Sequence, residues 1–400
     1  MQHYDFILAG GGAAGLSLAY QMVHEGLDGS ILIIDMETKT RNDRTWCFWI
    51  DEPMPYDEII SHRWEHIWFH GPERSHRFPL APYRYNMIRG IDFYNFTRER
   101  LDAAPNVTFC TARVDSVGDG SADGTTLPRV TIDSGEVFTA SWVFNSLFIP
   151  RDFVVDENRY FFLKQHFAGW VIRTEEPIFD PEAATMFDLR IPQNGAFRFM
   201  YLLPTSSNES LVEYTLFSEQ LLPKEEYIQG IRDYIRDQLG DVAYTIVEEE
   251  AGIIPMTDQP FLVHEGQRVM NIGTRGGRVK ASTGFAFLRT VRDSQRIVAS
   301  LKDSGTPFHD HYPPRRYRTF DSMLLSVLSA HPDDGRDIFI RLFERNPLIR
   351  LWRFLDEEGS LWENIKLMNT VPWWPFIFAW FRVKWKQTGI LFNRSSHTDG

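Results

Sequence analysis

The amino-terminal segment of the chain decides the fold. Residues 4–15 read Tyr-Asp-Phe-Ile-Leu-Ala-Gly-Gly-Gly-Ala-Ala-Gly, and after a helical stretch residues 31–35 read Ile-Leu-Ile-Ile-Asp. An apolar run, a glycine-rich turn, a helix and a second apolar run that ends in an acidic residue are the parts of a dinucleotide-binding βαβ unit. A lone glycine-rich turn would be weak evidence, but here every part occurs in order. We therefore predict a Rossmann-type nucleotide-binding domain.

Each part of this unit has a physical task. Gly10 allows the tight turn from strand to helix, Gly12 lets the backbone approach a pyrophosphate, and Gly15 permits close packing of the helix on the strand. The free N–H groups and the positive dipole at the start of the helix favour phosphate. Asp35 can accept hydrogen bonds from a ribose diol. The predicted cofactor-binding residues of this unit are Gly10, Gly12, Ala13, Ala14, Gly15 and Asp35.

A second glycine-rich segment follows a short apolar run far downstream. Residues 271–278 read Asn-Ile-Gly-Thr-Arg-Gly-Gly-Arg, which is typical of the late strand-to-helix turn that flavoproteins place against their cofactor. The alternative is a plain surface loop. We assign Gly273 to the cofactor site, and Gly276 and Gly277 would let the backbone lie flat against a ring. FAD is favoured over NAD because the first motif starts at residue 10 of a long chain.

Composition narrows the class of protein. The chain has 400 residues, of which 43% are hydrophobic and 24% are charged, as in globular proteins with more than one core. A net charge of −12 argues against a nucleic-acid partner. Two cysteines, Cys47 and Cys110, are too few for a disulfide framework and suggest a reducing compartment. We expect no signal peptide, because the first residues read as a strand, and no run of about 20 apolar residues that would span a bilayer.

Aromatic residues are unusually frequent. The chain has 31 Phe, 14 Tyr and 12 Trp, which together make 14% of it. They indicate either a large aromatic core or a long apolar pocket.

The remaining segments suggest three regions. Strand-like segments at 166–174, 185–190, 197–203 and 210–217 predict an antiparallel sheet in an inserted domain. A meander at 112–139 is expected to be split by a glycine-rich loop at 118–124. We predict an FAD-binding domain of residues 1–60, 86–150 and 250–305, a substrate-binding β-sheet domain of residues 61–85 and 151–249, and a helical, membrane-associating C-terminal region of residues 306–400.

Three histidines at helical spacing, His62, His66 and His70, raise the question of a metal site. The surrounding residues alternate as in a strand, and no carboxylate joins them at ligand spacing. We therefore predict solvated or packed histidines and no metal.

Two further segments carry chemistry. Residues 41–49 follow the acidic end of the βαβ unit, where ligands bind in such folds. Arg44 there could neutralise a phosphate or an anionic ring, and Trp46 and Trp49 could stack. In the second segment, alternation places Glu213 between Leu211 and Thr215 on one strand face. If that face lies in the core, burial raises the pKa of the Glu213 carboxyl and makes it an acid near neutrality; otherwise Glu213 is a solvated surface residue.

These motifs together resemble a known family. Residues 42–49 (Asn-Asp-Arg-Thr-Trp-Cys-Phe-Trp), the N-terminal fingerprint, residues 211–215 (Leu-Val-Glu-Tyr-Thr) and residues 282–285 (Ser-Thr-Gly-Phe) are similar to the bacterial lycopene β-cyclases. The resemblance runs from about residue 3 to the C-terminal region. It implies an α/β fold with an FAD-binding domain like that of glutathione reductase and the aromatic hydroxylases, and it places Gly284 at the cofactor.

The resemblance also implies a reaction. An isomerase of the intramolecular lyase type would close the linear ends of lycopene into the β-ionone rings of β-carotene, with Glu213 as the acid. Tyr214 stands where the family pattern usually has aspartate. The implied cofactor is reduced FAD, with NAD(P)H as the expected reductant. The alternatives are a flavin-dependent monooxygenase or polyprenyl reductase with an apolar substrate, and a flavin-binding carrier.

A lipid-soluble polyene requires access to a bilayer. Residues 371–381 read Val-Pro-Trp-Trp-Pro-Phe-Ile-Phe-Ala-Trp-Phe and are too short to span. With Arg382, Lys384 and Lys386 after them, they suit the headgroup boundary of an anionic membrane. A buried core helix is the alternative, and the two prolines weaken a continuous helix before Phe376. We expect a cytoplasmic protein that lies peripherally on the inner face of the cell membrane.

Overall fold

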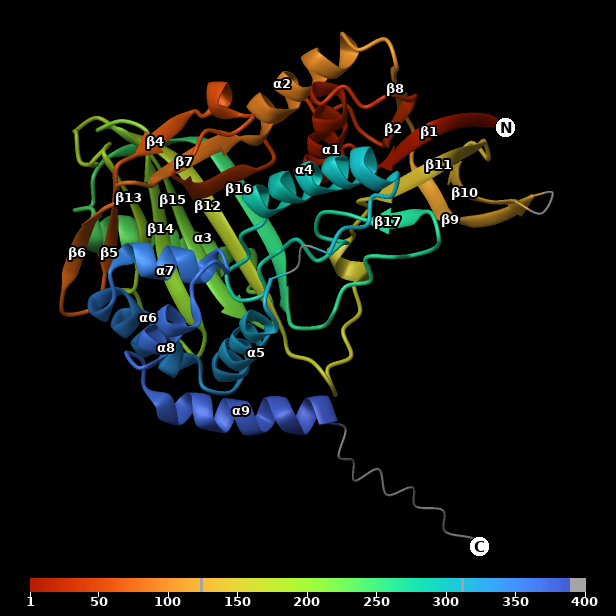
Figure 1. Ribbon diagram of the computed structural model, residues 1–400. Helices are drawn as coiled ribbons and strands as arrows, with labels where there is room; N and C mark the ends of the chain where they lie inside the picture. Colours follow the sequence, from red (N-terminus) through yellow and green to blue (C-terminus); the bar gives the residue numbers. More distant parts are fainter. Residues whose placement is uncertain (123–124, 311–312, 389–400) are drawn as a thin grey trace, which may run out of the picture.

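The computed structural model describes residues 1–122, 125–310 and 313–388. Three sheets and a group of C-terminal helices make up the fold (Figure 1). Sheet A carries the N-terminal βαβ unit. Sheet C is the other large sheet and is strongly curved, and sheet B is a small sheet of three strands.

Sheet A is a nucleotide-binding sheet. Its strand order is β8-β2-β1-β11-β10-β9, and β17 pairs with β11. The pairs of β1 with β2 and with β11 are parallel, whereas β10 is antiparallel to both of its neighbours. The strands are β1 (Gln2–Ala9), β2 (Ile31–Asp35), β8 (Val107–Thr111), β9 (Val114–Ala122), β10 (Thr125–Ile132), β11 (Val137–Asn145) and β17 (Val269–Asn271).

Three helices pack on sheet A: α1 (Ala13–His24), α2 (Gly90–Asp102) and α4 (Phe287–Ser304). Leu18 and Ala19 of α1 are fully buried in this core together with Val291 and Val298 of α4. The predicted βαβ unit is confirmed, because an apolar stripe on each helix covers the apolar strands beneath it.

The expected loop at 118–124 was wrong. Strand β9 continues through Gly118 and Gly120 to Ala122, and residues 123–124 lie outside the described part of the chain. Gly120 leaves room for its neighbour on β10, since a Cβ there would lie 2.3 Å from Nε of Arg129. Close approach of a side chain, and not a turn, therefore accounts for this glycine.

Sheet C is the predicted antiparallel sheet. Its order is β16-β12-β15-β14-β13-β5-β6, with one parallel pair, β13 and β5. The strands are β5 (His66–His70), β6 (Ser75–Pro79), β12 (Phe162–Thr174), β13 (Ala183–Asp188), β14 (Phe197–Pro204), β15 (Glu209–Ser218) and β16 (Tyr244–Thr257).

The expected domain boundary at residue 250 falls inside a strand. Residues 250–257 pair with β12 and belong to sheet C, not to the nucleotide-binding domain. Sheet B, with the order β3-β7-β4, consists of β3 (Thr45–Ile50), β4 (His62–Trp64) and β7 (Arg84–Arg89). Two short 3-10 helices span Asp57–Ile59 and Pro150–Asp152.

Both faces of the central strands of sheet C are covered. Helix α3 (Lys224–Gln238) packs Ile231 and Ile235 on one face, against Met200 and Val212. The C-terminal helices pack on the other face, near Phe197 of β14 (Figure 1). These helices are α5 (Arg315–Ala330), α6 (Pro332–Arg345), α7 (Leu348–Leu355), α8 (Leu361–Met368) and α9 (Trp373–Thr388).

Helix α9 runs along the outer edge of the molecule (Figure 1). It starts at Trp373 and contains Pro375, because a proline in the first helical turn sacrifices no intrahelical hydrogen bond. The expected weak point before Phe376 is therefore absent from this helix. In the described residues no helix combines the length and apolar character that a bilayer crossing needs. The expectation for residues 389–400 lies outside the described residues.

A buried cluster of charges ties the nucleotide domain to the C-terminal helices. The Lys280 ammonium, in the loop before α4, lies 2.7 Å from the Asp321 carboxylate of α5 and 2.9 Å from that of Glu357 after α7. Arg289 of α4 binds the same Glu357 at 2.9 Å. Lys280 is only 2% exposed, so its charge depends on these partners.

Removal of the Lys280 charge therefore tests how the two parts are held together. We expect Lys280→Met to lower the free energy of unfolding by about 3–5 kcal/mol, because two buried carboxylates lose a partner. The matched control is Lys302→Met, whose exposed ion pair with Glu25 (3.2 Å) should contribute less than about 1 kcal/mol. Denaturant unfolding at equal cofactor content measures both. Equal effects of the two substitutions would contradict the prediction.

Candidate active site

The first glycine-rich turn forms an open cradle at the carboxyl edge of sheet A. Gly10 has a φ of +105°, and a Cβ at Gly15 would lie 2.0 Å from the Gly10 carbonyl oxygen. A Cβ at Gly12 would meet no described atom within 4 Å, so the backbone there is open to a ligand. No side chain of the described residues caps the start of α1 at Gly12. Uncapped N–H groups beside an open glycine backbone fit a diphosphate.

The later glycine-rich turn lies against this cradle. A Cβ at Gly273 would lie 2.6 Å from the Cβ of Ala14, so the turn after β17 touches the first turn of α1. Gly276 and Gly277 face the protein, because a Cβ on either would meet Asn271 or Phe261. Gly273 therefore lies beside the first turn of α1, whereas Gly276 and Gly277 serve the internal packing of the turn.

Asp35 ends β2 beside the cradle. Its Oδ2 accepts a hydrogen bond from the Gly11 N–H at 2.6 Å, and its Oδ1 lies 3.3 Å from the Lys39 ammonium. The carboxylate is thus held at the edge of the predicted ribose position.

The loop around Arg44 leads into the second site. Arg44 is exposed, and its backbone carbonyl accepts a hydrogen bond from Gly90 at 2.7 Å. Trp46 stacks on Phe287 of α4, with ring centroids 5.0 Å apart. Trp49 stacks on Trp352 of α7 at 5.3 Å. The two tryptophans therefore join β3 to α4 and α7. Their rings stack on Phe287 and Trp352 of the protein itself.

Glu213 lies on a buried face of sheet C. Its neighbours on that face, Leu211 and Thr215, are 5% and 0% exposed, and Glu213 itself is 6% exposed. The alternative of a solvated surface residue is excluded by this burial.

Two polar groups contact the Glu213 carboxyl. The Thr215 hydroxyl donates a hydrogen bond to it, and the Glu250 carboxyl of β16 is its other hydrogen-bond partner. Burial raises the pKa of Glu213 well above that of an ordinary glutamate, and the nearby Glu250 raises it further. This carboxyl therefore holds its proton more tightly than an ordinary glutamate does, which suits it to act as an acid.

Three further side chains complete the surroundings of Glu213. Tyr201 lies directly across from it on β14, and its hydroxyl is 2.5 Å from that of Tyr85 on β7. Cys47 of β3 lies close enough to both hydroxyls for them to influence the pKa of its thiol. Burial raises the pKa of all three groups, so they stay neutral and leave the carboxyls as the ionisable groups.

Tyr214 points to the other side of the sheet. Its hydroxyl accepts a hydrogen bond from Arg198 at 2.8 Å, and its ring fills the space above Gly230 of α3. Successive strand residues face opposite sides, so a side chain at this position cannot reach the Glu213 carboxyl.

One cavity borders this site at Cys47, and a second cavity adjoins the first. The smaller, of about 360 Å³, is lined by Cys47 and by the loop before α4. The larger, of about 820 Å³, lies between sheet C and the C-terminal helices and is lined mostly by apolar side chains. Both share Thr283, Phe285 and Leu355. Gly284 itself packs against β12, because a Cβ there would lie 2.3 Å from the Gln165 amide oxygen.

The three histidines occupy strands, and His62 and His70 have separate hydrogen-bond partners. His62 contacts the Pro181 carbonyl at 3.0 Å, and His70 contacts the Ser75 hydroxyl at 2.7 Å. Within the described ranges no group of three or more His, Cys, Asp or Glu side chains is arranged to hold a metal ion.

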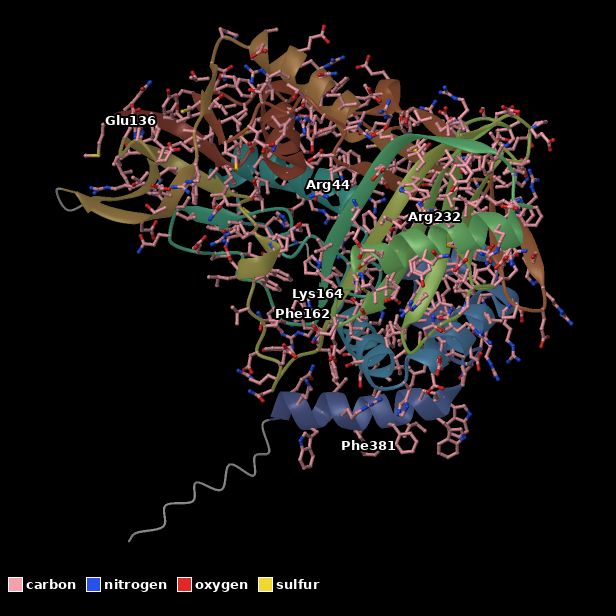
Figure 2. The ribbon with its side chains drawn as sticks, turned by 180° about the vertical axis from the view of Figure 1, so that it is seen from behind. Arg44, Glu136, Phe162, Lys164, Arg232 and Phe381 are labelled. Atoms are coloured by element: carbon pink, nitrogen blue, oxygen red, sulfur yellow. The ribbon has the colours of Figure 1, made fainter. Side chains whose placement is uncertain are left out.

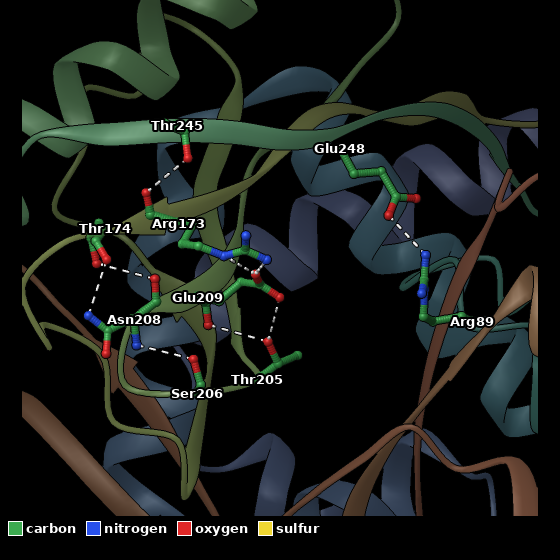
Figure 3. A network of polar contacts seen from close by, with 9 residues as sticks. All are labelled: Arg89, Arg173, Thr174, Thr205, Ser206, Asn208, Glu209, Thr245 and Glu248. Atoms are coloured by element: carbon green, nitrogen blue, oxygen red, sulfur yellow. Dashed lines mark hydrogen bonds and ion pairs between the residues drawn. The ribbon is translucent and has the colours of Figure 1, made fainter.

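Several site residues escape sequence reasoning. Glu250 and Tyr201 come from distant strands that the register of sheet C brings to Glu213, and Tyr85 reaches Tyr201 from sheet B. Polar contacts at the rim hold these strands, among them the 3.0 Å ion pair between Arg89 and Glu248 (Figure 3). A run of three glutamates at 248–250 gives no local signal that its last member is buried.

The raised pKa of Glu213 predicts a dependence of stability on pH. A carboxyl that holds its proton more tightly in the folded than in the unfolded chain lowers stability as the pH rises above its unfolded value. We expect the melting temperature of Glu213→Gln to fall less than that of the wild type between about pH 6 and about pH 9. Glu209→Gln, at the outer end of the same strand, is the control. An equal fall in the two proteins would show that Glu213 is already ionised in the folded protein over this range.

Known proteins resemble this chain in sequence and in structure. Residues 5–379 match the family described as Lycopene cyclase protein. The lycopene beta-cyclase of Pantoea ananas is 24% identical over 396 residues, which cover 94% of this chain and 97% of the relative. That of Pseudescherichia vulneris is 23% identical over 392 residues and covers 94% and 96%.

The structural likenesses concern the fold. A geranylgeranyl bacteriochlorophyll reductase-like protein of Thermoplasma acidophilum superimposes with a TM-score of 0.57 at 13% identity, over 97% of each chain. The flavin-dependent brominase Bmp2 superimposes with a TM-score of 0.56 at 14% identity, over 91% of this chain and 97% of the other. They confirm the predicted α/β fold of flavin-dependent reductases and monooxygenases. By the match over nearly its whole length, the chain belongs to the lycopene cyclase family.

Proposed function

We propose that this protein is a lycopene beta-cyclase, which closes the linear ends of lycopene into β-ionone rings with Glu213 as the acid. The observation that carries the proposal is the buried Glu213 carboxyl with its raised pKa, on an apolar sheet face near the cavity that Cys47 lines. The names of the bacterial relatives support the substrate.

The reaction needs a positioned acid and an environment without water. Protonation of a terminal C=C bond leaves a tertiary carbocation, which the π electrons of a neighbouring C=C bond attack to form the ring. The ring then loses a proton, so that one proton enters, one leaves and no electrons are consumed. Water would trap the cation as an alcohol, and aromatic walls exclude it while their faces stabilise positive charge.

The larger cavity suits the polyene chain. Phe339 and Phe343 of α6 and Phe354 of α7 contribute to its lining, and Phe285 joins it to the smaller cavity beside Cys47. Because the Cys47 thiol contacts Tyr85 and Tyr201, this route ends next to Glu213. We propose that the end of the polyene reaches the acid along this path.

The cofactor of the proposal is reduced FAD. The cradle at Gly10, Gly12 and Gly15 fits its diphosphate, and Asp35 and Gly273 border the same place. When bound, reduced FAD would supply a negatively charged ring that stabilises nearby positive charge. The Arg44 guanidinium acts to lower the pKa of the Glu250 carboxyl, so its positive charge lies near the two carboxyls of the site. We keep NAD(P)H as the proposed reductant, since the flavin must stay reduced.

Expression in a lycopene-accumulating host tests the function. We expect the wild type to convert the red pigment to yellow β-carotene, and Glu213→Gln to abolish the conversion with FAD still bound. Glu209→Gln, a carboxyl of the same strand outside the site, should convert normally. Loss of more than about 100-fold is expected for a general acid.

The contradicting outcome is red pigment in the presence of folded, flavin-loaded wild type. A monooxygenase or a polyprenyl reductase is the second candidate, because the structural relatives include both kinds of fold. Such an enzyme would consume NAD(P)H, and its product would differ in mass from lycopene, whereas a cyclised product has the same mass.

Helix α9 supports peripheral contact with a membrane. One of its faces exposes Trp374 (61%), Phe378 (60%) and Trp385 (65%), whereas Ala379 and Val383 on the other face are buried. Figure 2 shows Phe381 pointing away from the body of the protein. A row of large aromatic side chains suits the headgroup boundary.

One of the basic residues near this row, Lys386, differs in orientation from the expectation. Lys386 turns toward the protein, where its ammonium donates a hydrogen bond to the Tyr160 carbonyl at 3.0 Å. We therefore propose that aromatic burial, more than lipid charge, binds α9 to the inner face of the cell membrane.

Substitution of the exposed aromatic side chains tests this contact. We expect Trp373→Ser, Trp374→Ser and Trp385→Ser combined to weaken binding to phosphatidylglycerol and phosphatidylethanolamine vesicles by tenfold or more, since each buried side chain contributes about 1.5 kcal/mol or more. Leu262→Ser, an exposed apolar residue elsewhere, is the control. Vesicle co-sedimentation measures both, and unchanged binding of the triple variant would contradict the proposal.

A further inference from the structure

We propose that Glu250 is a positioning residue that forms a two-carboxyl site with Glu213, in which one proton is shared and Glu250 stays ionised. The proposal rests on the proposed function of Glu213 as the acid. Glu250 would keep Glu213 protonated and would place a negative charge beside the developing cation.

A glycine makes the pairing possible. Strand β12 lies between β15 and β16, and its Gly169 is in register with Glu213 on one side and with Glu250 on the other. A Cβ at this position would lie 3.2 Å from the Cβ of Glu213 and 3.0 Å from Cδ1 of Leu211. Because Gly169 has no side chain, the two carboxyls on its flanks meet across the strand.

The hydrogen bonds assign the proton. Thr45 of β3 donates to Oε2 of Glu250 at 2.8 Å, and Thr215 donates to Glu213. Burial raises the pKa of both carboxyls, that of Glu213 well above and that of Glu250 less far above the ordinary value of a glutamate. The contact between them raises the pKa of Glu213 further while it acts to lower that of Glu250. Glu213 therefore carries the proton and donates it to Glu250, in accordance with the rule that two adjacent carboxyls do not both ionise near neutrality.

The charged groups around the pair agree with this assignment. Arg44, before β3, lowers the pKa of Glu250, whereas Glu248 of β16 raises it. Glu248 is itself paired with Arg89 and accepts a hydrogen bond from Asn42 at 2.7 Å. The other titratable groups that face the pair are neutral: Cys47 of β3, Tyr85 of β7 and Tyr201 of β14.

The pair balances the reaction without a further reagent. Glu213 gives its proton to the terminal C=C bond, and the O–H bond breaks as a C–H bond forms. Both carboxyls are then negative beside the carbocation, which offsets their repulsion. A ring C–H bond then breaks, its electrons form the C=C bond of the ring, and its proton returns to Glu213. The pair therefore ends the cycle as it began.

The experiment compares Glu250→Gln with Glu249→Gln, the neighbouring exposed glutamate on the opposite face of β16. Without the Glu250 charge, Glu213 loses its proton more easily. In the pH profile of the cyclisation rate, we therefore expect the fall on the alkaline side (the alkaline limb) to move to lower pH by about one unit. The rate on that limb then falls about tenfold. Glu249→Gln should keep the wild-type limb, and Glu250→Asp should restore it in part. A merely structural role would lower the rate at every pH without moving the limb.

An infrared measurement separates this proposal from the proposed function. The C=O band of a protonated carboxyl, identified by its loss in Glu213→Gln, should titrate at lower pH in Glu250→Gln than in the wild type, whatever the substrate is. Should Glu250→Gln fail to fold, Gly169→Ala keeps both carboxyls and separates them, and the band should move in the same direction. If the titration midpoint of this band is unchanged in folded Glu250→Gln or Gly169→Ala, the proposed carboxyl pair is wrong. If the wild type leaves lycopene unchanged, only the proposed function is wrong.

Discussion

The burial of the Glu213 carboxyl is the constraint on which the rest of the site depends. A carboxylate in apolar surroundings is strongly disfavoured, so the group stays protonated unless a charge compensates it. Sheet C provides these surroundings, because helices cover both of its faces. The neutral hydroxyls of Tyr85 and Tyr201 add polar partners without adding charge. The packing of the sheet thus keeps a proton on the carboxyl that the proposed reaction uses.

The fold itself is shared with redox enzymes, and the proposed chemistry differs from theirs. In the proposed reaction the nucleotide-binding domain holds a cofactor that ends each cycle unchanged, and the proton moves on sheet C. The Lys280 cluster joins the last loop of the nucleotide domain to α5 and α7, so the cavity walls and the cradle are mechanically connected. Function in this family therefore depends on the residues of the site and not on the fold alone.

Local patterns predicted most of the elements and one half of the proposed acid pair. The alternation around Glu213 and the glycine spacing at Gly10 and Gly15 are contained in short segments, so the sequence alone predicts their structure. Glu250 could not be found in this way, because the register of three strands across Gly169 brings it to Glu213. Gly120 misled the prediction for a related reason, since cross-strand packing and not a turn requires it.

The most direct test of the central claim is the mass of the product formed in heavy water. Acid-initiated ring closure adds one solvent-derived proton to carbon and removes another, without electrons. The account predicts a β-carotene that carries one deuterium for each ring formed and is otherwise equal in composition to the lycopene supplied. A product without deuterium, or one that has gained hydrogen or oxygen, would contradict it.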